Sequence, residues 1–161
     1  MMNKEFHTVR GYQLLEENKR HLTSAMEDYL EMIYRNSMDE GYIRIGRLAE
    51  LLNVRAPSAS KMVHRLSELG LLKFKKYGII MMNENGKEIG EYLLERHKII
   101  EDFLKLLGCE EDLLQQTELI EHTVNPEALK NIRLFSSFLI NNDEIRNKYN
   151  EYRLIFNQMQ N

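Results

Sequence analysis

The chain has 161 residues, 43% of them hydrophobic and 29% charged, which is enough to bury a core as one domain or as two small ones. No apolar run approaches the roughly 20 residues of a membrane-spanning helix, and the first residues lack the apolar segment of a secretory signal, so we expect a cytoplasmic protein with no membrane partner. The single Cys109 excludes an intramolecular disulfide, and we expect it to be a buried or half-buried residue at a helix end.

Charge is unevenly distributed along the chain. The window from Tyr42 to Asn83 contains eight basic and two acidic residues and carries +6; because the whole chain carries −3, the remainder carries −9. This division indicates a basic module that faces phosphate and an acidic module that faces something cationic. Only two prolines and eight glycines interrupt apolar residues at helical spacing, which predicts a mainly α-helical chain.

The first predicted elements are a polar extension, residues 1–22, and a helix from Thr23 to about Asn36. The extension can form a short helix over residues 12–19, and it is either an arm that packs on the body or on a second subunit, or a frayed terminus. Thr23 or Ser24 can cap the helix that follows. Asp28 and Glu31 are three residues apart in it and therefore share a face.

Two short helices separated by a tight turn come next. The first is predicted over Arg44 to Leu52, Pro57 opens the second, and Gly70 ends it. Small polar and basic residues on the outer face of the second helix are what a helix-turn-helix needs to enter the DNA major groove, whereas a helical hairpin with a solvated face is the plainer alternative. The DNA contacts predicted here are Arg55, Ser58, Ser60, Lys61 and Arg65.

Two strand-like runs, residues 71–75 and 79–82, follow the second helix and are joined by Lys76-Tyr77-Gly78. A basic hairpin directly after a recognition helix is a wing, and its Lys75, Lys76 and Tyr77 can bind phosphate without reading sequence. Together these features favour a winged helix-turn-helix DNA-binding domain over residues 23–83.

Residues 84–161 are predicted to form an all-α domain. Asn83 can cap a long helix that carries His97 on or beside its apolar stripe, where a lone histidine is usually a core residue. Further helices are expected over residues 110–123, 126–140 and from 143 to near the end. Their apolar surface exceeds what a small bundle buries, which predicts a homodimer.

One short cluster in this domain concentrates chemically active side chains. Glu118, Glu121 and His122 lie within little more than one helical turn and would share a face. Two carboxylates and an imidazole so close attract cations, although such a patch is more often a solvated surface. The cluster gains weight as a metal site only if other segments supply ligands.

From about Thr23 to at least Asn141, the sequence resembles the diphtheria toxin repressor family of metal-dependent transcriptional repressors, and within it the manganese transport regulators of MntR type. Three segments carry the resemblance: residues 24–31 (Ser-Ala-Met-Glu-Asp-Tyr-Leu-Glu), residues 95–97 (Glu-Arg-His) and residues 118–122 (Glu-Leu-Ile-Glu-His). The resemblance implies a site for two Mn²⁺ ions per subunit, with the ligands Asp28, Glu31, His97, Glu118, Glu121 and His122.

Iron-responsive members of that family are similar but place Met where this chain has Asp28 and Cys where it has Glu118. Two carboxylates harden the site and favour Mn²⁺, with Fe²⁺ or Zn²⁺ as alternatives. The implied function is a manganese-responsive repressor that binds a palindromic double-stranded operator as a metal-loaded dimer and controls metal-ion uptake genes. The alternatives are an iron- or zinc-responsive repressor of the same family and a metal-independent winged-helix regulator that senses an organic ligand.

A dinuclear metal enzyme of the helical-bundle type is a third alternative. It needs a Glu-x-x-His motif from each of two helices, and this chain has none. The sequence also lacks a His-Glu-x-x-His motif, a phosphate-binding loop and a plausible nucleophile–base pair. We therefore expect no enzymatic activity and no small organic substrate.

Overall fold

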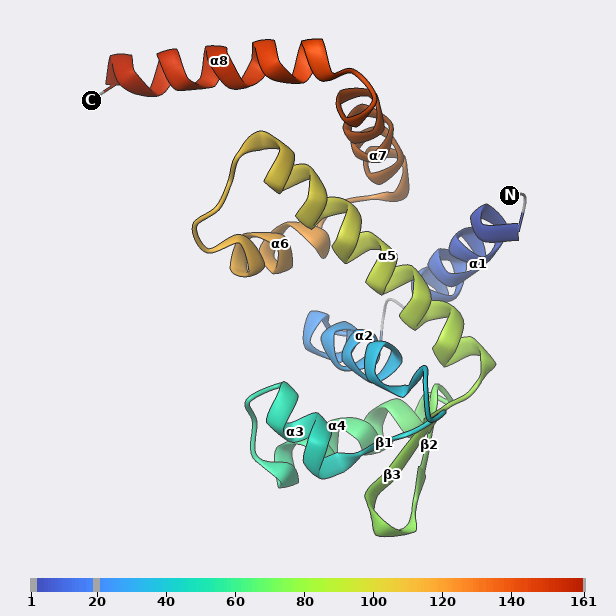
Figure 1. The fold of residues 1–161 in the computed structure, drawn as a ribbon. Coiled ribbons are helices and arrows are strands. Elements are labelled where there is room, and N and C mark those ends of the chain that lie inside the picture. The colour runs from blue at the N-terminus through green and yellow to red at the C-terminus, as the bar shows by residue number, and fades with distance from the viewer. Residues whose placement is uncertain (1–2, 19–20, 161) are drawn as a thin grey trace. The chain divides into compact units, whose positions relative to one another are not determined.

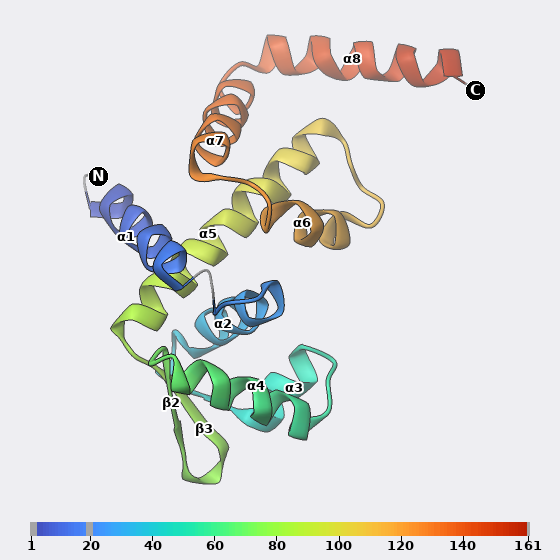
Figure 2. The ribbon, with the colours of Figure 1, turned by 180° about the vertical axis from the view of Figure 1, so that it is seen from behind.

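The computed structural model describes residues 3–18 and 21–160, which form two compact units, one ending at Arg96 and one beginning at His97 (Figure 1, Figure 2). The first unit contains α1 (Asn3–Asn18), α2 (Ser24–Ser37), β1 (Ile43–Arg44), α3 (Ile45–Leu51), α4 (Ala56–Glu68), β2 (Leu72–Lys75), the 3-10 turn η1 (Lys76–Gly78), β3 (Ile79–Met82) and the first part of α5 (Glu84–Leu107). The second contains the rest of α5, α6 (Leu113–Glu121), α7 (Pro126–Ile140) and α8 (Asp143–Gln160). The predicted mainly α fold class, with a winged helix-turn-helix followed by an all-α part, is confirmed. None of the helices in the described residues combines the length and the hydropathy of a membrane span.

A shared apolar core holds α2, α3 and α4 together. α2 begins where the sequence predicts, because the Thr23 side chain accepts a hydrogen bond from the Met26 backbone N–H at 3.4 Å. α4 begins at Ala56 with Pro57 in its first turn, and Gly70, at φ 71°, follows its end. The side chains of this core with no exposed surface are Leu30, Ile33, Leu48, Ala59, Val63 and Leu66. The pattern read as a helix-turn-helix is therefore a packed unit.

The wing is an antiparallel hairpin of β2 and β3, closed at its tip by η1. Figure 1 and Figure 2 both show this hairpin extending beyond α3 and α4. Gly78 at the tip has φ 71°, and a Cβ atom there would lie 2.6 Å from Ile45 Cγ2, so the turn requires glycine. The preceding Tyr77 has φ 63° and is 88% exposed. The predicted wing is confirmed.

The short strand β1 was not predicted. It pairs with β3 through Ile43 opposite Ile80 and Arg44 opposite Ile79, which gives the sheet order β1-β3-β2. The sequence placed Arg44 in the following helix, but α3 begins at Ile45. Two residues are too few for an alternating pattern, so the strand is visible only through its pairing.

α1 extends further toward the N-terminus than the predicted helix over residues 12–19, whose last residue lies outside the described residues. It lies beside the first part of α5 in both ribbon views (Figure 1, Figure 2). Leu15 is 6% exposed, and the Arg10 and Glu88 side chains form an ion pair at 2.7 Å. Of the two open interpretations, an arm that packs on the body is the one observed.

In the second unit, the sequence predicts the start of α7 but not the start of α6. Asn125 caps α7, since its Oδ1 accepts a hydrogen bond from the Ala128 backbone N–H at 2.8 Å. α6 begins later than expected, at Leu113, because Asp112 before it has a left-handed φ of 51°. Cys109 is exposed, so the prediction of a buried or half-buried residue is wrong: the chain leaves the end of α5 there in an open turn.

Candidate metal centre and DNA interface

In the first unit, α2 carries two of the predicted metal ligands, Asp28 and Glu31, one turn apart. Asp28 is half-buried, and the Glu31 side chain is only 12% exposed. Glu31 Oε1 accepts a hydrogen bond from the Arg35 guanidinium at 2.5 Å. A carboxylate withdrawn from water in this way needs a cation beside it, and Arg35 supplies positive charge from the same helix.

In the second unit, three further predicted ligands come from α5 and from the end of α6. His97 Nδ1 lies 3.0 Å from Glu121 Oε2, and His122 Nε2 lies 3.9 Å from Glu121 Oε1. Glu121 is 1% exposed and His97 is 6% exposed. His97 and Glu121 are 24 residues apart in sequence, and in the structure these two side chains touch.

Glu118 occupies a different environment from Glu121. It lies one turn earlier on α6 and is exposed. An exposed carboxylate stays hydrated and is free to turn, so Glu118 can reach toward or away from its neighbours on α6 at little cost. The structure therefore brings Glu121, His97 and His122 together and leaves Glu118 at the surface.

The donor set of this cluster fits a divalent cation. Where His97 and Glu121 touch, a proton can lie between nitrogen and oxygen, which is a position that a metal ion can also occupy. Imidazole nitrogens and carboxylate oxygens are ligands for first-row divalent metals, and a set without sulfur suits the harder ones. With the proton there, the His97 Nδ1–H donates to Glu121 and the His97 Nε2 keeps a lone pair for a metal. With the proton on Nε2, the Nδ1 lone pair can bind a metal itself, so both tautomers are compatible with metal binding.

Four of the five DNA contacts predicted for the recognition helix are accessible, and those within α4 share one face. Arg55 is the N-cap residue of α4, and Ser58, Lys61 and Arg65 are exposed, whereas Ser60 is half-buried. The opposite face of α4 packs into the core. A helix held by one face, with small polar and basic side chains on the other, can enter a major groove.

The predicted wing contacts are also accessible. Lys75, Lys76 and Tyr77 are exposed at the end of β2 and in η1. The His64 ring of α4 packs edge-on against Phe74 of β2, with the ring centroids 4.9 Å apart, and so fixes the hairpin against the recognition helix. Sequence reasoning missed this contact because it depends on how the chain turns at Gly70.

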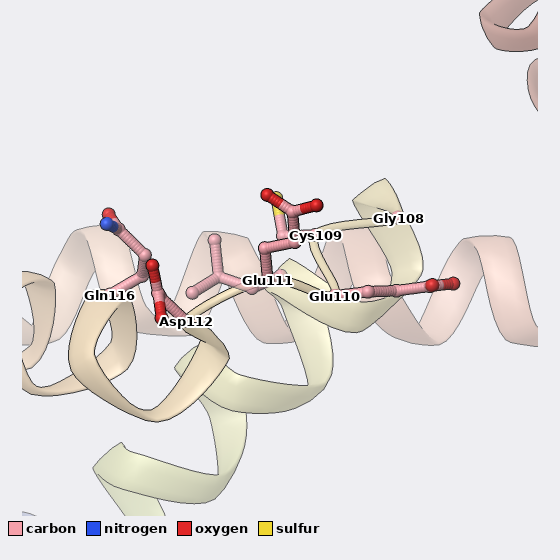
Figure 3. A pocket seen from close by; sticks show the side chains of 7 residues that line it. Gly108, Cys109, Glu110, Glu111, Asp112 and Gln116 are labelled. Atoms are coloured by element: carbon pink, nitrogen blue, oxygen red, sulfur yellow. The ribbon is translucent and has the colours of Figure 1, made fainter.

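A hollow of about 590 Å³ lies at the end of α5 in the second unit (Figure 3). Its lining consists of Leu104, Gly108, Cys109, Glu110, Glu111, Asp112 and Gln116. None of the six predicted metal ligands lines it. Exposed acidic side chains on a turn explain its polar character without a ligand.

The chain combines a winged helix-turn-helix that carries accessible cations with a helical unit that contains a buried carboxylate–imidazole cluster. This combination defines the class of metal-responsive DNA-binding regulators. Comparison with family models identifies the protein family within that class. Residues 21–80 match the model "Iron dependent repressor, N-terminal DNA binding domain", and residues 83–147 match "Iron dependent repressor, metal binding and dimerisation domain". The chain belongs to this family, which is the diphtheria toxin repressor family that the sequence resembles.

Two relatives show which branch of the family this chain is similar to. The chain is 39% identical over 111 residues to the HTH-type transcriptional regulator MntR of Geobacillus thermodenitrificans (strain NG80-2), and 38% identical over 111 residues to that of Geobacillus kaustophilus (strain HTA426). Each match spans 68% of this chain and 79% of the relative. The chain is thus an MntR-type member.

A solved structure titled as that of the manganese regulator SloR resembles this one with a TM-score of 0.62 and 28% sequence identity. The resemblance spans 70% of this chain and 54% of that one, so this chain accounts for about half of that protein's length. T. acidophilum IdeR, at 22% identity and a TM-score of 0.58, shows the fold alone.

Family membership establishes the broad function. The protein is a metal-responsive DNA-binding transcriptional repressor, and the family is one of regulators, so the alternative of a metal enzyme is excluded. Its two domains bind DNA and a divalent metal ion, and the second dimerises.

Proposed function

We propose that this protein is a manganese-responsive repressor that binds a palindromic operator as a metal-loaded homodimer in the cytoplasm and controls metal-ion uptake genes. The observation that carries the proposal is the Glu121 carboxylate, 1% exposed and held 3.0 Å from His97 Nδ1, in a ligand set that contains no sulfur. A carboxylate so deeply buried is costly unless it is paired with positive charge.

The proposed ligands are those that the family resemblance implies, and they would hold two ions per subunit. They are Asp28, Glu31, His97, Glu118, Glu121 and His122. Four carboxylates and two imidazoles supply enough oxygen and nitrogen donors for two octahedral ions once water completes the coordination. Bound Mn²⁺ would supply the positive charge needed to hold four carboxylates in one site.

Manganese is favoured by the chemistry of two positions. Asp28 and Glu118 stand where iron-responsive relatives have a thioether and a thiol, and replacing sulfur with carboxylate makes the site harder. The printed names of the MntR relatives and of the manganese regulator SloR agree with this choice. Fe²⁺ and Zn²⁺ bind such donors too, so cellular availability contributes to selection.

Two of the proposed ligands lie on α2, which packs in the same core as the recognition helix. Without metal, these carboxylates repel the other proposed carboxylate ligands, which disfavours their close approach. Metal binding to Asp28 and Glu31 would then stabilise the arrangement of α2 that the DNA-binding conformation needs. Linkage requires that operator DNA tighten metal binding by the same factor, and a coupling of about 1–3 kcal/mol is ordinary.

DNA recognition is divided between two elements. In the proposal, α4 reads base edges through Arg55, Ser58, Ser60, Lys61 and Arg65, and the wing binds the phosphate backbone through Lys75, Lys76 and Tyr77. A two-fold dimer places two recognition helices in half-sites about one helical turn apart. Exposed apolar side chains on α7, such as Leu134 (66%) and Phe138 (46%), are available for the dimer interface.

The test begins with selection of an operator from random-sequence duplexes in the presence of Mn²⁺. DNA-binding anisotropy is then measured across Mn²⁺, Fe²⁺, Zn²⁺ and chelator, with the metal content determined in parallel. We expect Mn²⁺ to activate binding and chelator to abolish it. Activation by Zn²⁺ alone would overturn the choice of metal, and binding that is indifferent to every metal would favour a regulator that senses an organic ligand.

Glu118→Ala tests the ligand set directly. We expect it to abolish metal-dependent operator binding, because it removes a proposed ligand at one of the two positions that distinguish this chain from iron-responsive relatives. Glu127→Ala, which removes an exposed carboxylate in the first turn of α7, is the matched control. Unchanged metal dependence in Glu118→Ala would contradict the assignment of Glu118 as a ligand.

A further inference from the structure

Helix α1 lies outside the part of the chain that the family models match, which begins at residue 21. Its contact with α5 is unusually close. A Cβ atom added to Gly11 would lie 2.3 Å from the Glu88 carbonyl oxygen and 2.8 Å from Tyr92 Cβ. Only glycine allows two helices to approach this closely at that point. The docking of α1 on α5 is therefore encoded by a specific residue.

Beyond Gly11, the contact continues into the interior of the first unit. The Tyr12 ring of α1 lies against the Tyr92 ring of α5, with the centroids 5.7 Å apart. Tyr92 is 2% exposed, and burial raises the pKa of its phenol to about 12. The Arg96 guanidinium carbon lies 6.0 Å from the centroid of the same ring. Tyr92 thus links α1 to Arg96.

Arg96 then reaches α2. Its guanidinium donates to Glu27 Oε2 at 2.7 Å, and the two side chains are only 5% and 16% exposed. Six residues earlier on α5, a Cβ atom added to Gly90 would lie 2.6 Å from Tyr34 Cβ of α2. α2 and α5 are therefore held together at two places, by a close approach at Gly90 and by the buried ion pair of Arg96.

These contacts lie next to the proposed metal ligands in sequence. Glu27 precedes Asp28 and lies one helical turn before Glu31, while Arg96 precedes His97. We propose that α1 and the Glu27–Arg96 ion pair form a brace that positions the ligands of α2 and α5 for metal binding, with Arg96 as the central positioning residue. This inference rests on the proposed function only in taking those neighbours as metal ligands.

The physical reason is preorganisation. A ligand helix that is free to shift must be ordered when the metal binds, and that ordering weakens the observed affinity. Residues behind metal ligands that fix their orientation typically change metal affinity by about 10- to 100-fold when they are replaced. Arginine suits this role because its planar fork holds a carboxylate in a defined geometry and stacks on an aromatic ring.

The first test separates docking of α1 from folding of α1. Gly11→Leu raises helix propensity in α1 but forces its backbone away from Glu88, whereas Gln13→Leu makes the same kind of change at an exposed position of the same helix. Mn²⁺ binding to the full-length apo protein is measured without DNA, from the electron paramagnetic resonance signal of free Mn²⁺. We expect Gly11→Leu to weaken Mn²⁺ binding by about 10-fold, the lower end of that range, and Gln13→Leu to bind as the wild type does.

The second test replaces Arg96 in the same assay. We expect Arg96→Met to weaken Mn²⁺ binding by about 10- to 100-fold, and Arg96→Lys to recover part of that loss because it keeps the charge without the fork. Thermal unfolding in chelator and non-specific DNA binding at low salt report on the fold. Arg96→Met leaves the Glu27 carboxylate without the Arg96 guanidinium and should lower the melting temperature, so Mn²⁺ is titrated at a temperature where every variant is folded. Under those conditions, non-specific DNA binding should change far less than Mn²⁺ affinity.

The outcomes distinguish a failure of the proposed brace from a failure of the proposed manganese-responsive function. If the wild type fails to bind Mn²⁺, the proposed function is wrong and the brace has no metal to serve. If the wild type binds Mn²⁺ but Gly11→Leu matches Gln13→Leu, the brace is wrong while the proposed function stands. Equal Mn²⁺ affinity in Arg96→Met and the wild type, or a loss of affinity that merely follows a loss of fold, would also overturn it.

Discussion

The charged side chains of the DNA-binding face are exposed to solvent, whereas a charged side chain of the metal-ligand cluster is buried. Lys75 and Lys76 in the wing are exposed, and no side chain of the hairpin buries them. Glu121 is almost wholly buried and lies against His97. Phosphate is a large partner that arrives from solvent, so cations that bind it must stay hydrated and accessible. A metal ion is a small partner that replaces water, so its ligands can be buried before it arrives.

This difference predicts how each region responds to substitution. An exposed charge contributes one of many similar phosphate contacts, so its removal weakens DNA binding only by the share of that one contact. A buried charge belongs to a small set in which every member is required, and its removal leaves the others unbalanced. The experiments below test that contrast, beginning with the largest effect that we expect.

Glu121→Gln should produce the largest change. It keeps the volume of the side chain but removes the charge opposite His97, so we expect Mn²⁺ affinity to fall by more than about 100-fold, beyond the effect of replacing a residue that only orients a ligand. Mn²⁺ titration followed by DNA-binding anisotropy measures both consequences. Glu127→Gln, an exposed carboxylate in α7, serves as the control. A Glu121→Gln protein that responds to Mn²⁺ as the wild type does would mean that Glu121 is buried for structural reasons alone.

The double substitution Lys75→Ala with Lys76→Ala should have an intermediate effect. We expect weaker binding to all DNA sequences alike, and a slope of log affinity against log salt that is smaller by about two, because two phosphate contacts are lost. Mn²⁺ affinity without DNA should not change. Lys130→Ala, which removes an exposed charge on α7, is the control. Loss of discrimination between operator and random DNA would show instead that the wing reads bases.

Tyr92→Phe should have the smallest effect at neutral pH and a distinctive one in alkali. Burial raises the Tyr92 pKa from 10.0 to about 12, so between these values the folded state holds a proton that the unfolded state has lost. Stability therefore falls as pH rises through that window, by on the order of 2–3 kcal/mol. Urea unfolding of the apo proteins between about pH 9 and about pH 12 should show a shallower decline in Tyr92→Phe than in the wild type. Parallel declines would place Tyr92 in a hydrated environment.

Local signals in the sequence predicted most of the helix ends. Thr23 caps α2, Pro57 lies in the first turn of α4, and α7 begins at Pro126 as expected. Each of these signals acts through atoms within four residues, so it works in any tertiary context. The wing was also predictable, because Gly78 supplies the positive φ that its tip requires.

Predictions failed where a feature depends on distant residues. β1 contains two residues and exists only because β3 offers a partner. Cys109 was expected to be buried or half-buried by its chemical type, but its exposure is set by how the chain leaves α5. The assignment of all six ligands and of the domain boundary at residues 83–84 stays a prediction, which the substitutions above address for the ligands.

The sequence by itself determined the order of the helices and the polarity of the recognition helix and wing, because these depend on residue chemistry and on spacing along one helix or hairpin. Tertiary structure alone decided that α1 docks on α5 through Gly11, that Tyr92 and Arg96 connect α1 to α2, and that Glu121 lies against His97. Those contacts join residues separated by many helical turns. Their energies depend on burial and on close approach, which no periodicity in the sequence specifies.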